Sequence, residues 1–69
     1  MRFDAGPLLE HAARRYGTTS ATQLAPSLGV HRRTIGEWKR KGLPLNTADR
    51  AAVRLGVHPS HVWPDWHQR

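Results

Sequence analysis

The chain has 69 residues, no cysteine and a formal net charge of +6. A chain of this length has room for one small domain, so we expect residues 1–69 to fold as a single unit without disulfides or thiolate metal sites. The sequence has no apolar run near the roughly 20 residues that a membrane helix requires and no signal-peptide pattern at its start. We therefore expect a soluble, cytoplasmic protein with no membrane partner.

Positive charge is concentrated in one short segment. Eleven Lys and Arg residues are set against five acidic residues, and the pI is about 11.5. Between His31 and Lys41 the only acidic residue is Glu37. Polyanions are the natural partners of such a segment. The cations in it are Arg32, Arg33, Lys39, Arg40 and Lys41.

The first predicted helix follows Asp4. Asp4 is a favourable N-cap, and Pro7 falls in the first turn, where its missing N–H costs little. Gly17 is placed to end this helix in a left-handed conformation. Apolar side chains recur at three- and four-residue spacing, which is typical of a helix with one face in the core. The predicted inward positions are Leu8, Leu9, Ala12, Ala13 and Tyr16.

The second and third predicted helices are separated by a tight turn. Ser20 and Gln23 have the spacing of a capping box, which predicts a helix from there to about Leu28. Gly29 ends that helix, and a third helix follows with Ile35 and Trp38 on its buried side. Gly42 and Pro44 mark the end of the third helix.

Two more short helices complete the prediction. Asn46 or Thr47 offers the next cap, and the following helix ends at Gly56. Pro59 is suited to the first position of a short fifth helix that Pro64 would stop. No sustained period-two pattern competes, so the fold class is predicted as all-α, a compact bundle of about five short helices. The remaining predicted core positions are Ala48, Ala51, Ala52, Leu55 and Trp63, while the sequence leaves open whether Trp66 is exposed and serves dimerisation.

Residues 20–41 have the pattern of a helix-turn-helix. Two helices that cross steeply need a small residue at their closest approach, which Ala25 provides. They also need a residue that tolerates positive φ in the turn, which Gly29 provides. The apolar side chains that would fill the wedge between these helices are Leu24, Leu28, Val30, Ile35 and Trp38.

This stretch resembles the DNA-binding unit of the Cro and lambda-repressor-like family. The segment from Leu55 to Pro64 is similar to the end of the Ner-like phage and bacterial regulators, and together the resemblances cover residues 7–64. Two positions depart from the family pattern. Pro26 is expected to remove one backbone hydrogen bond and to bend or shorten the second helix. His31 stands at the N-cap of the third helix, where Ser, Asn or Asp is commoner.

The resemblance implies that the chain binds double-stranded DNA with its third helix in the major groove. Its base-contacting candidates are Arg32, Arg33, Gly36 and Glu37. Its phosphate-contacting candidates are Ser20, Thr22, His31, Thr34, Lys39, Arg40, Lys41 and Asn46. Alternatives remain beside these roles. The cations can form an ordinary solvated face, Glu37 can form ion pairs with Arg33 or Lys41, and His31 can simply cap the helix.

The leading hypothesis is a sequence-specific transcription regulator, of the phage or prophage repressor or Cro type, in the nucleoid of a bacterial or phage-infected cell. The alternatives are an architectural or excisionase-type recombination factor and an antitoxin-like interaction module. Homodimerisation, including pairing only on DNA, is left open. No nucleophile with an adjacent base, paired carboxylates or phosphate-binding glycine loop is present, so we expect no enzyme activity, cofactor or small-molecule substrate. His58 and His61 alone are a weak metal site.

Overall fold

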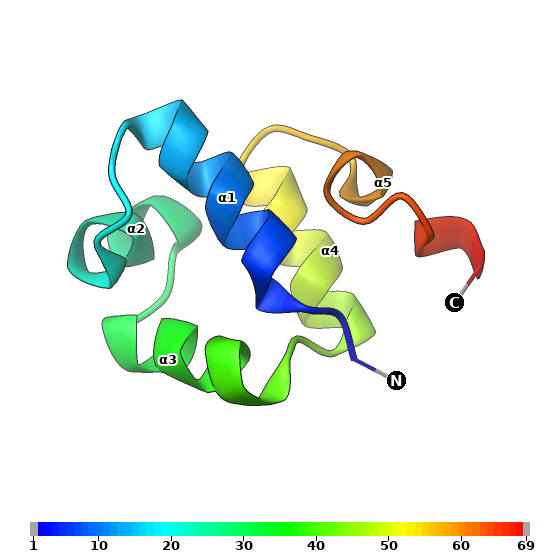
Figure 1. The fold of residues 1–69 in the computed structure, drawn as a ribbon, viewed down its shortest axis with the longest axis horizontal. Coiled ribbons are helices and arrows are strands. Elements are labelled where there is room, and N and C mark those ends of the chain that lie inside the picture. The colour runs from blue at the N-terminus through cyan, green and yellow to red at the C-terminus, as the bar shows by residue number, and fades with distance from the viewer. Residues whose placement is uncertain (1, 69) are drawn as a thin grey trace.

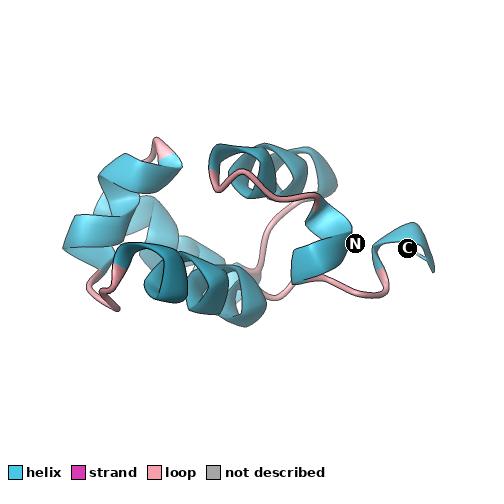
Figure 2. Ribbon diagram, turned by 90° about the horizontal axis from the view of Figure 1, so that it is seen from above, coloured by secondary structure: helices cyan, strands magenta, loops and turns pink. Residues whose placement is uncertain are grey.

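The structure, a computed structural model that describes residues 2–68, is built from helices and tight turns (Figure 1). Figure 2 shows helices and loops but no strand in this part of the chain, so the predicted all-α bundle is confirmed. None of its helices combines the length and the apolar character needed to cross a membrane. The elements are α1 (Ala5–Tyr16), α2 (Ala21–Leu28), α3 (Arg32–Lys41), α4 (Leu45–Arg54), α5 (Pro59–Val62) and the 3-10 helix η1 (Trp66–Gln68).

The helices surround one apolar core. α1 contacts α2, α3 and α5, while α4 contacts α2 and α5. α2 and α3 are neighbours in sequence and also lie against each other. In Figure 1, α3 runs along the lower edge of the molecule, with the other helices on one side of it. This placement leaves one long face of α3 turned away from the bundle.

Helix α1 begins and ends as the sequence predicts. The Gly6 N–H donates to Asp4 Oδ1 at 3.2 Å, which satisfies one of the N–H groups that a helix start leaves without a partner. Gly17 follows the last helical residue with φ 68°, in the left-handed region that favours glycine.

The predicted capping box at Ser20 is wrong. Ser20 is the N-cap of α2, but its side chain makes no cap hydrogen bond. The Ser20 N–H instead donates to Thr18 Oγ1 at 3.1 Å, which shows that Thr18 organises the approach to this helix. Pro26 does not end α2, which continues to Leu28.

The predicted cap of α4 at Asn46 or Thr47 is also wrong. The helix begins earlier, at Leu45, with Pro44 as the N-cap. Pro has no side-chain acceptor, so this end has no side-chain cap. Asn46 lies inside the first turn, where its Oδ1 accepts from the Thr47 N–H at 2.9 Å.

Two helices end in the same backbone motif. After α2, the Gly29 N–H donates to Pro26 O at 3.1 Å and the Val30 N–H to Ala25 O at 3.0 Å. After α4, Gly56 and Val57 make the equivalent hydrogen bonds to Val53 and Ala52, at 2.9 Å and 3.1 Å. This is the Schellman motif, and it turns an apolar residue back onto the core directly after each helix.

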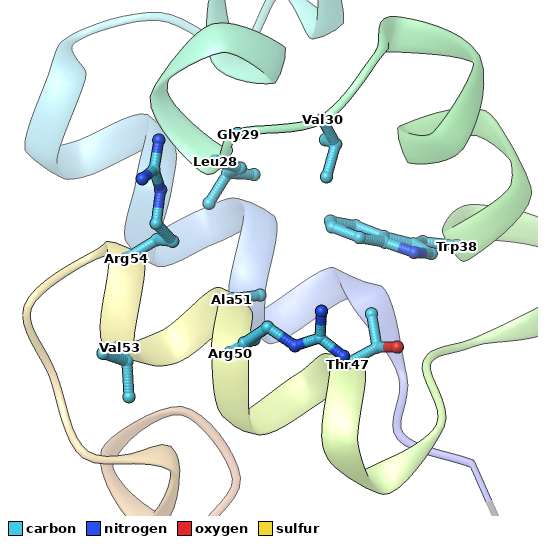
Figure 3. Close-up of a pocket in the computed structure, with 9 residues that line it drawn as sticks. All are labelled: Leu28, Gly29, Val30, Trp38, Thr47, Arg50, Ala51, Val53 and Arg54. Atoms are coloured by element: carbon cyan, nitrogen blue, oxygen red, sulfur yellow. The ribbon is translucent and has the colours of Figure 1, made fainter.

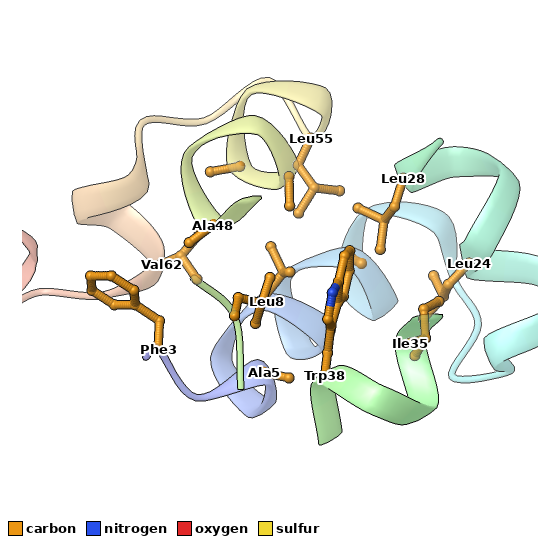
Figure 4. Close-up of a cluster of buried hydrophobic side chains, with 14 of the residues drawn as sticks. Phe3, Ala5, Leu8, Leu24, Leu28, Ile35, Trp38, Ala48, Leu55 and Val62 are labelled. Carbon is orange, nitrogen blue, oxygen red and sulfur yellow. The ribbon is translucent and has the colours of Figure 1, made fainter. Parts of the chain in front are cut away.

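The core contains most of the side chains predicted to be buried, and Tyr16 is the clear exception (Figure 4). Tyr16, predicted to be buried, is 40% exposed and contacts the Arg15 guanidinium, whose carbon lies 5.9 Å from the ring centroid. Tyr16 is wrongly assigned to the core because it stands in the last turn of α1, where the chain leaves the bundle. Trp66, whose placement the sequence leaves open, is half-buried, and its ring centroid lies 4.7 Å from that of Phe3.

Phe3 and Leu43 are core residues that the helical periodicity does not reveal. Both are fully buried. They pair through their backbones, since each N–H donates to the carbonyl of the other at 2.8 Å. Trp63 closes the same region, because its Nε1–H donates to Asp4 O at 2.8 Å. The segment before α1 is thereby joined both to the turn after α3 and to the end of α5.

Candidate nucleic-acid interface

Helix α3 has one face in the core and the other in solvent. Ile35 and Trp38 anchor it, with 1% and 6% of their side chains exposed. The three-residue spacing of these anchors places them on one side of the helix. Thr34 beside them is half-buried, whereas the other residues of α3 are exposed. Apolar packing of Ile35 and Trp38 therefore fixes which side of the helix faces the core.

The face opposite the anchors carries Arg33, Gly36 and Arg40. These residues follow one another at three- and four-residue spacing, so they form one row along α3. A Cβ added at Gly36 would meet no heavy atom within 4 Å, so the middle of this row is open space. Arg32 and Lys39 lie beside the row on the Ile35 side. A cationic strip thus runs along the solvent side of the helix, with Glu37 on its other flank.

His31 organises the start of α3. Its Nδ1 accepts from the Arg33 N–H at 3.1 Å, so His31 caps the helix as one of the two sequence hypotheses states. A ring nitrogen that accepts a hydrogen bond carries no proton, so in the neutral imidazole the proton is on Nε2. The exposed His31 ring consequently has a donor at Nε2 in addition to its role as a cap.

Glu37 is exposed and makes no ion pair with Arg33 or Lys41 in the described part of the chain. The helical spacing permits both pairs, but the structure contains neither. The carboxylate is therefore available to an external donor on one flank of the cationic strip.

The remaining phosphate-contact candidates lie around α3. Ser20 and Thr22 are exposed at the start of α2, and the Ser20 hydroxyl makes no cap hydrogen bond. Asn46 is exposed in the first turn of α4, close in sequence to the end of α3. A helix start carries partial positive charge and N–H donors, both of which suit an anion.

Lys39, Arg40 and Lys41 occupy the last turn of α3 and are all exposed. Cations at this end of a helix also stabilise it, by about 0.3–1 kcal/mol each at low salt, because they face the negative end of the helix dipole. Their charge thus has a local structural use that is independent of any ligand.

The histidines do not assemble a metal site. Residues 2–68 bring no group of three or more His, Cys, Asp or Glu side chains together in a way that would hold a metal ion. His58 caps α5 instead, since its Nδ1 accepts from the Ser60 N–H at 3.1 Å.

Sequence reasoning missed two arginines on α4 that border a hollow beside the α2–α3 turn. Arg50 and Arg54 are exposed and lie one helical turn apart. The sequence contains a signal for these arginines, because Thr47, Arg50 and Arg54 follow one another at the same three- and four-residue spacing that was used for α3. Figure 3 shows these side chains with the turn and Trp38.

Searches against family models, curated proteins and solved structures found no match for this chain.

Proposed function

We propose that this chain is a sequence-specific transcription regulator that binds double-stranded DNA and inserts α3 into the major groove. The observation that carries the proposal is the two-sided character of α3. Ile35 and Trp38 hold one side in the core, while Arg33, Gly36 and Arg40 form an exposed row on the other. A rigid helix with an open cationic face is the form in which helix-turn-helix proteins present side chains to base edges.

The two kinds of contact are expected from different parts of the surface. Arg32, Arg33 and Glu37 are proposed to read bases, with Gly36 allowing close approach to the groove floor. An arginine that bonds guanine through O6 and N7 contributes about 1–3 kcal/mol of discrimination. The proposed phosphate contacts set register without reading sequence. They come from Ser20, Thr22, His31, Thr34, Lys39, Arg40, Lys41 and Asn46, among which the half-buried Thr34 has the least exposed side chain.

The proposed biological role is that of a phage or prophage repressor or Cro-type protein, which acts by occupying an operator and excluding polymerase. About five neutralised phosphates would give a log–log salt slope of roughly −4 to −5. A regulator of this kind distinguishes its site from random DNA by a factor of roughly 10³ or more, whereas an architectural factor distinguishes far less.

The test begins with selection of bound sequences from a random duplex library, followed by fluorescence anisotropy on the selected and a scrambled duplex. We expect Arg33→Ala to remove the preference for the selected site and Lys41→Ala to weaken both duplexes alike. Arg14→Ala is the matched control, because Arg14 is also exposed but lies in the last turn of α1. Equal losses on both duplexes for Arg33→Ala and Lys41→Ala would contradict base reading by α3. No duplex affinity at low salt would end the proposal.

A further inference from the structure

A hollow of about 440 Å³ lies between the α2–α3 turn and α4, away from the cationic row of α3. Its apolar lining comes from Leu28 at the end of α2, Val30 in the turn, Trp38 on α3, and Ala51 and Val53 on α4 (Figure 3). Trp38 lies on the anchored side of α3 and lines this hollow. The hollow and the row of Arg33, Gly36 and Arg40 therefore lie on different sides of that helix.

The rim of the hollow is positively charged. Arg54 extends over the turn, since a Cβ added at Gly29 would lie 3.0 Å from an Arg54 guanidinium nitrogen. Arg50 lies one helical turn earlier on α4, and Figure 3 shows it reaching toward Thr47. Neither arginine makes an ion pair within residues 2–68. Two guanidinium groups without carboxylate partners therefore border an apolar floor.

The hollow is open rather than enclosed. Val53 at its edge is 63% exposed, and Arg50 and Arg54 are exposed as well. A small ligand bound in a pocket typically has about 70–90% of its surface buried, which an open hollow does not provide. An extended or helical segment fits better, because it can place one side chain on the floor and others over the rim.

The positive charge of the rim and of the whole chain indicates which kind of molecule can occupy the hollow. A second copy of this chain is disfavoured because each copy carries a formal net charge of +6. A segment with carboxylates on both sides of a large apolar side chain matches the floor and both arginines, and Arg binds carboxylates through two parallel hydrogen bonds.

We propose that this hollow, lined by Leu28, Val30, Trp38, Ala51 and Val53 and bordered by Arg50 and Arg54, docks an acidic peptide segment of a partner protein through one apolar anchor. The docking does not require DNA. Its position on the anchored side of α3 leaves the cationic row accessible, so a protein partner and a duplex can be bound at once.

The probe is a fluorescein-labelled peptide with a Leu-Trp anchor flanked by Asp and Glu on both sides. One control peptide has Asn and Gln in place of the acids, and a second has Ala-Ala in place of the anchor. We expect only the first peptide to bind, and we expect its addition to shift the Val30 and Ala51 amide signals and the Trp38 indole N–H signal in ¹H–¹⁵N spectra.

Two exposed positions of α4 provide matched variants. Val53→Asp brings a carboxylate to the rim, whereas Leu45→Asp makes the same change at a residue that is 54% exposed and does not line the hollow. We expect Val53→Asp to weaken the peptide on the order of tenfold and Leu45→Asp to leave it unchanged, which corresponds to about 1.4 kcal/mol for the former. Circular dichroism of both variants verifies that the fold is retained.

Several results would overturn the docking proposal. The first is that the neutral control peptide binds as tightly as the acidic peptide, and the second is that the spectral shifts are confined to Arg33, Gly36 and Arg40. The third is that a saturating duplex displaces the peptide. The fourth is that a small aromatic acid such as indole-3-acetate binds in the hollow more tightly than the peptide does. A loss of duplex affinity in Arg50→Gln and Arg54→Gln with no loss of peptide affinity would assign these arginines to DNA instead. If the chain binds no duplex but binds the peptide in the hollow, the proposed function fails and the docking site stands.

Discussion

The two ends of α3 are held in place by different means. At its C-terminal end, backbone groups make the contacts. The Gly42 N–H donates to Trp38 O, and the next residue, Leu43, pairs through both of its backbone groups with Phe3. These bonds are 2.8 Å long, and the side chains of Phe3 and Leu43 are fully buried. This end is therefore fixed by pairing between segments that are far apart in the sequence.

At the N-terminal end, exposed side chains add to the backbone hydrogen bonds that Gly29 and Val30 make in the preceding turn. His31 caps the helix through its imidazole, and the Arg54 guanidinium lies over Gly29 in the preceding turn. Both His31 and Arg54 are exposed. Exposed side chains change conformation more readily than a buried backbone pair, so we expect the N-terminal end of α3 to open locally at lower free energy. This is the end that the proposed function directs toward base edges.

The largest effect is expected at the buried end, from Phe3→Ala. The Phe3 ring lies 5.2 Å from the Trp63 ring and 4.7 Å from the Trp66 ring, measured between centroids. Removal of a buried aromatic side chain costs about 3–5 kcal/mol. A domain of this size has a total stability of roughly 3–10 kcal/mol, so the variant should be close to unfolding. Urea unfolding monitored by circular dichroism measures the loss, with Leu45→Ala as an exposed control. A loss under about 1 kcal/mol would show that Phe3 does not hold this end.

A smaller but still large loss is expected for Gly42→Ala. Gly42 has φ 77° and ψ −174°, a conformation that is essentially restricted to glycine and costs other residues about 1–3 kcal/mol. An added Cβ would lie 2.7 Å from the Phe3 carbonyl oxygen, so the backbone pair must also move. We expect a total loss of about 3 kcal/mol in urea unfolding. Gly17→Ala is the control, because Gly17 has φ 68° but nothing within 4 Å of an added Cβ. Equal losses of stability in the two variants would mean that the close contact between the added Cβ and the Phe3 carbonyl oxygen does not contribute.

The importance of Phe3 and Leu43 was predictable in part from a signal outside helical periodicity. A hydrophobic residue just before an N-cap commonly contacts the fourth helical residue, five positions later. Four helices of this chain have an apolar pair at that spacing, and both members of each pair belong to the core or lie against it. The pairs are Phe3 and Leu8, Val30 and Ile35, Leu43 and Ala48, and Val57 and Val62. What the sequence does not reveal is that the Phe3 and Leu43 backbones pair, because no local pattern specifies a contact between distant segments.

The candidate interface and the hollow also differ in how much of each can be predicted from the sequence. Ile35 and Trp38 fix which face of α3 is buried, so the exposed positions of Arg33 and Arg40 follow from the spacing alone. The Ser20 capping box failed because a matching pair of residue types does not exclude a competing local bond, here from Thr18. The hollow beside Arg50 and Arg54 has contributions from α2, the turn, α3 and α4. A surface built from several elements depends on their relative placement, which periodicity within one helix does not contain.

The smallest effect is expected at the N-terminal end of α3, from His31→Ala. Loss of a side-chain cap costs about 0.5–2 kcal/mol, because the Arg33 N–H loses its acceptor. Asn is among the best N-cap residues, so His31→Asn should recover most of that stability in urea unfolding.

The two variants also separate capping from the proposed phosphate contact at Nε2. We expect both to weaken binding to the selected duplex, since both remove the ring donor, and a neutral hydrogen bond contributes about 0.5–1.5 kcal/mol. His31→Asn with wild-type DNA affinity would limit His31 to its cap, and His31→Asn as unstable as His31→Ala would show that an imidazole cap is not what holds this end of the helix.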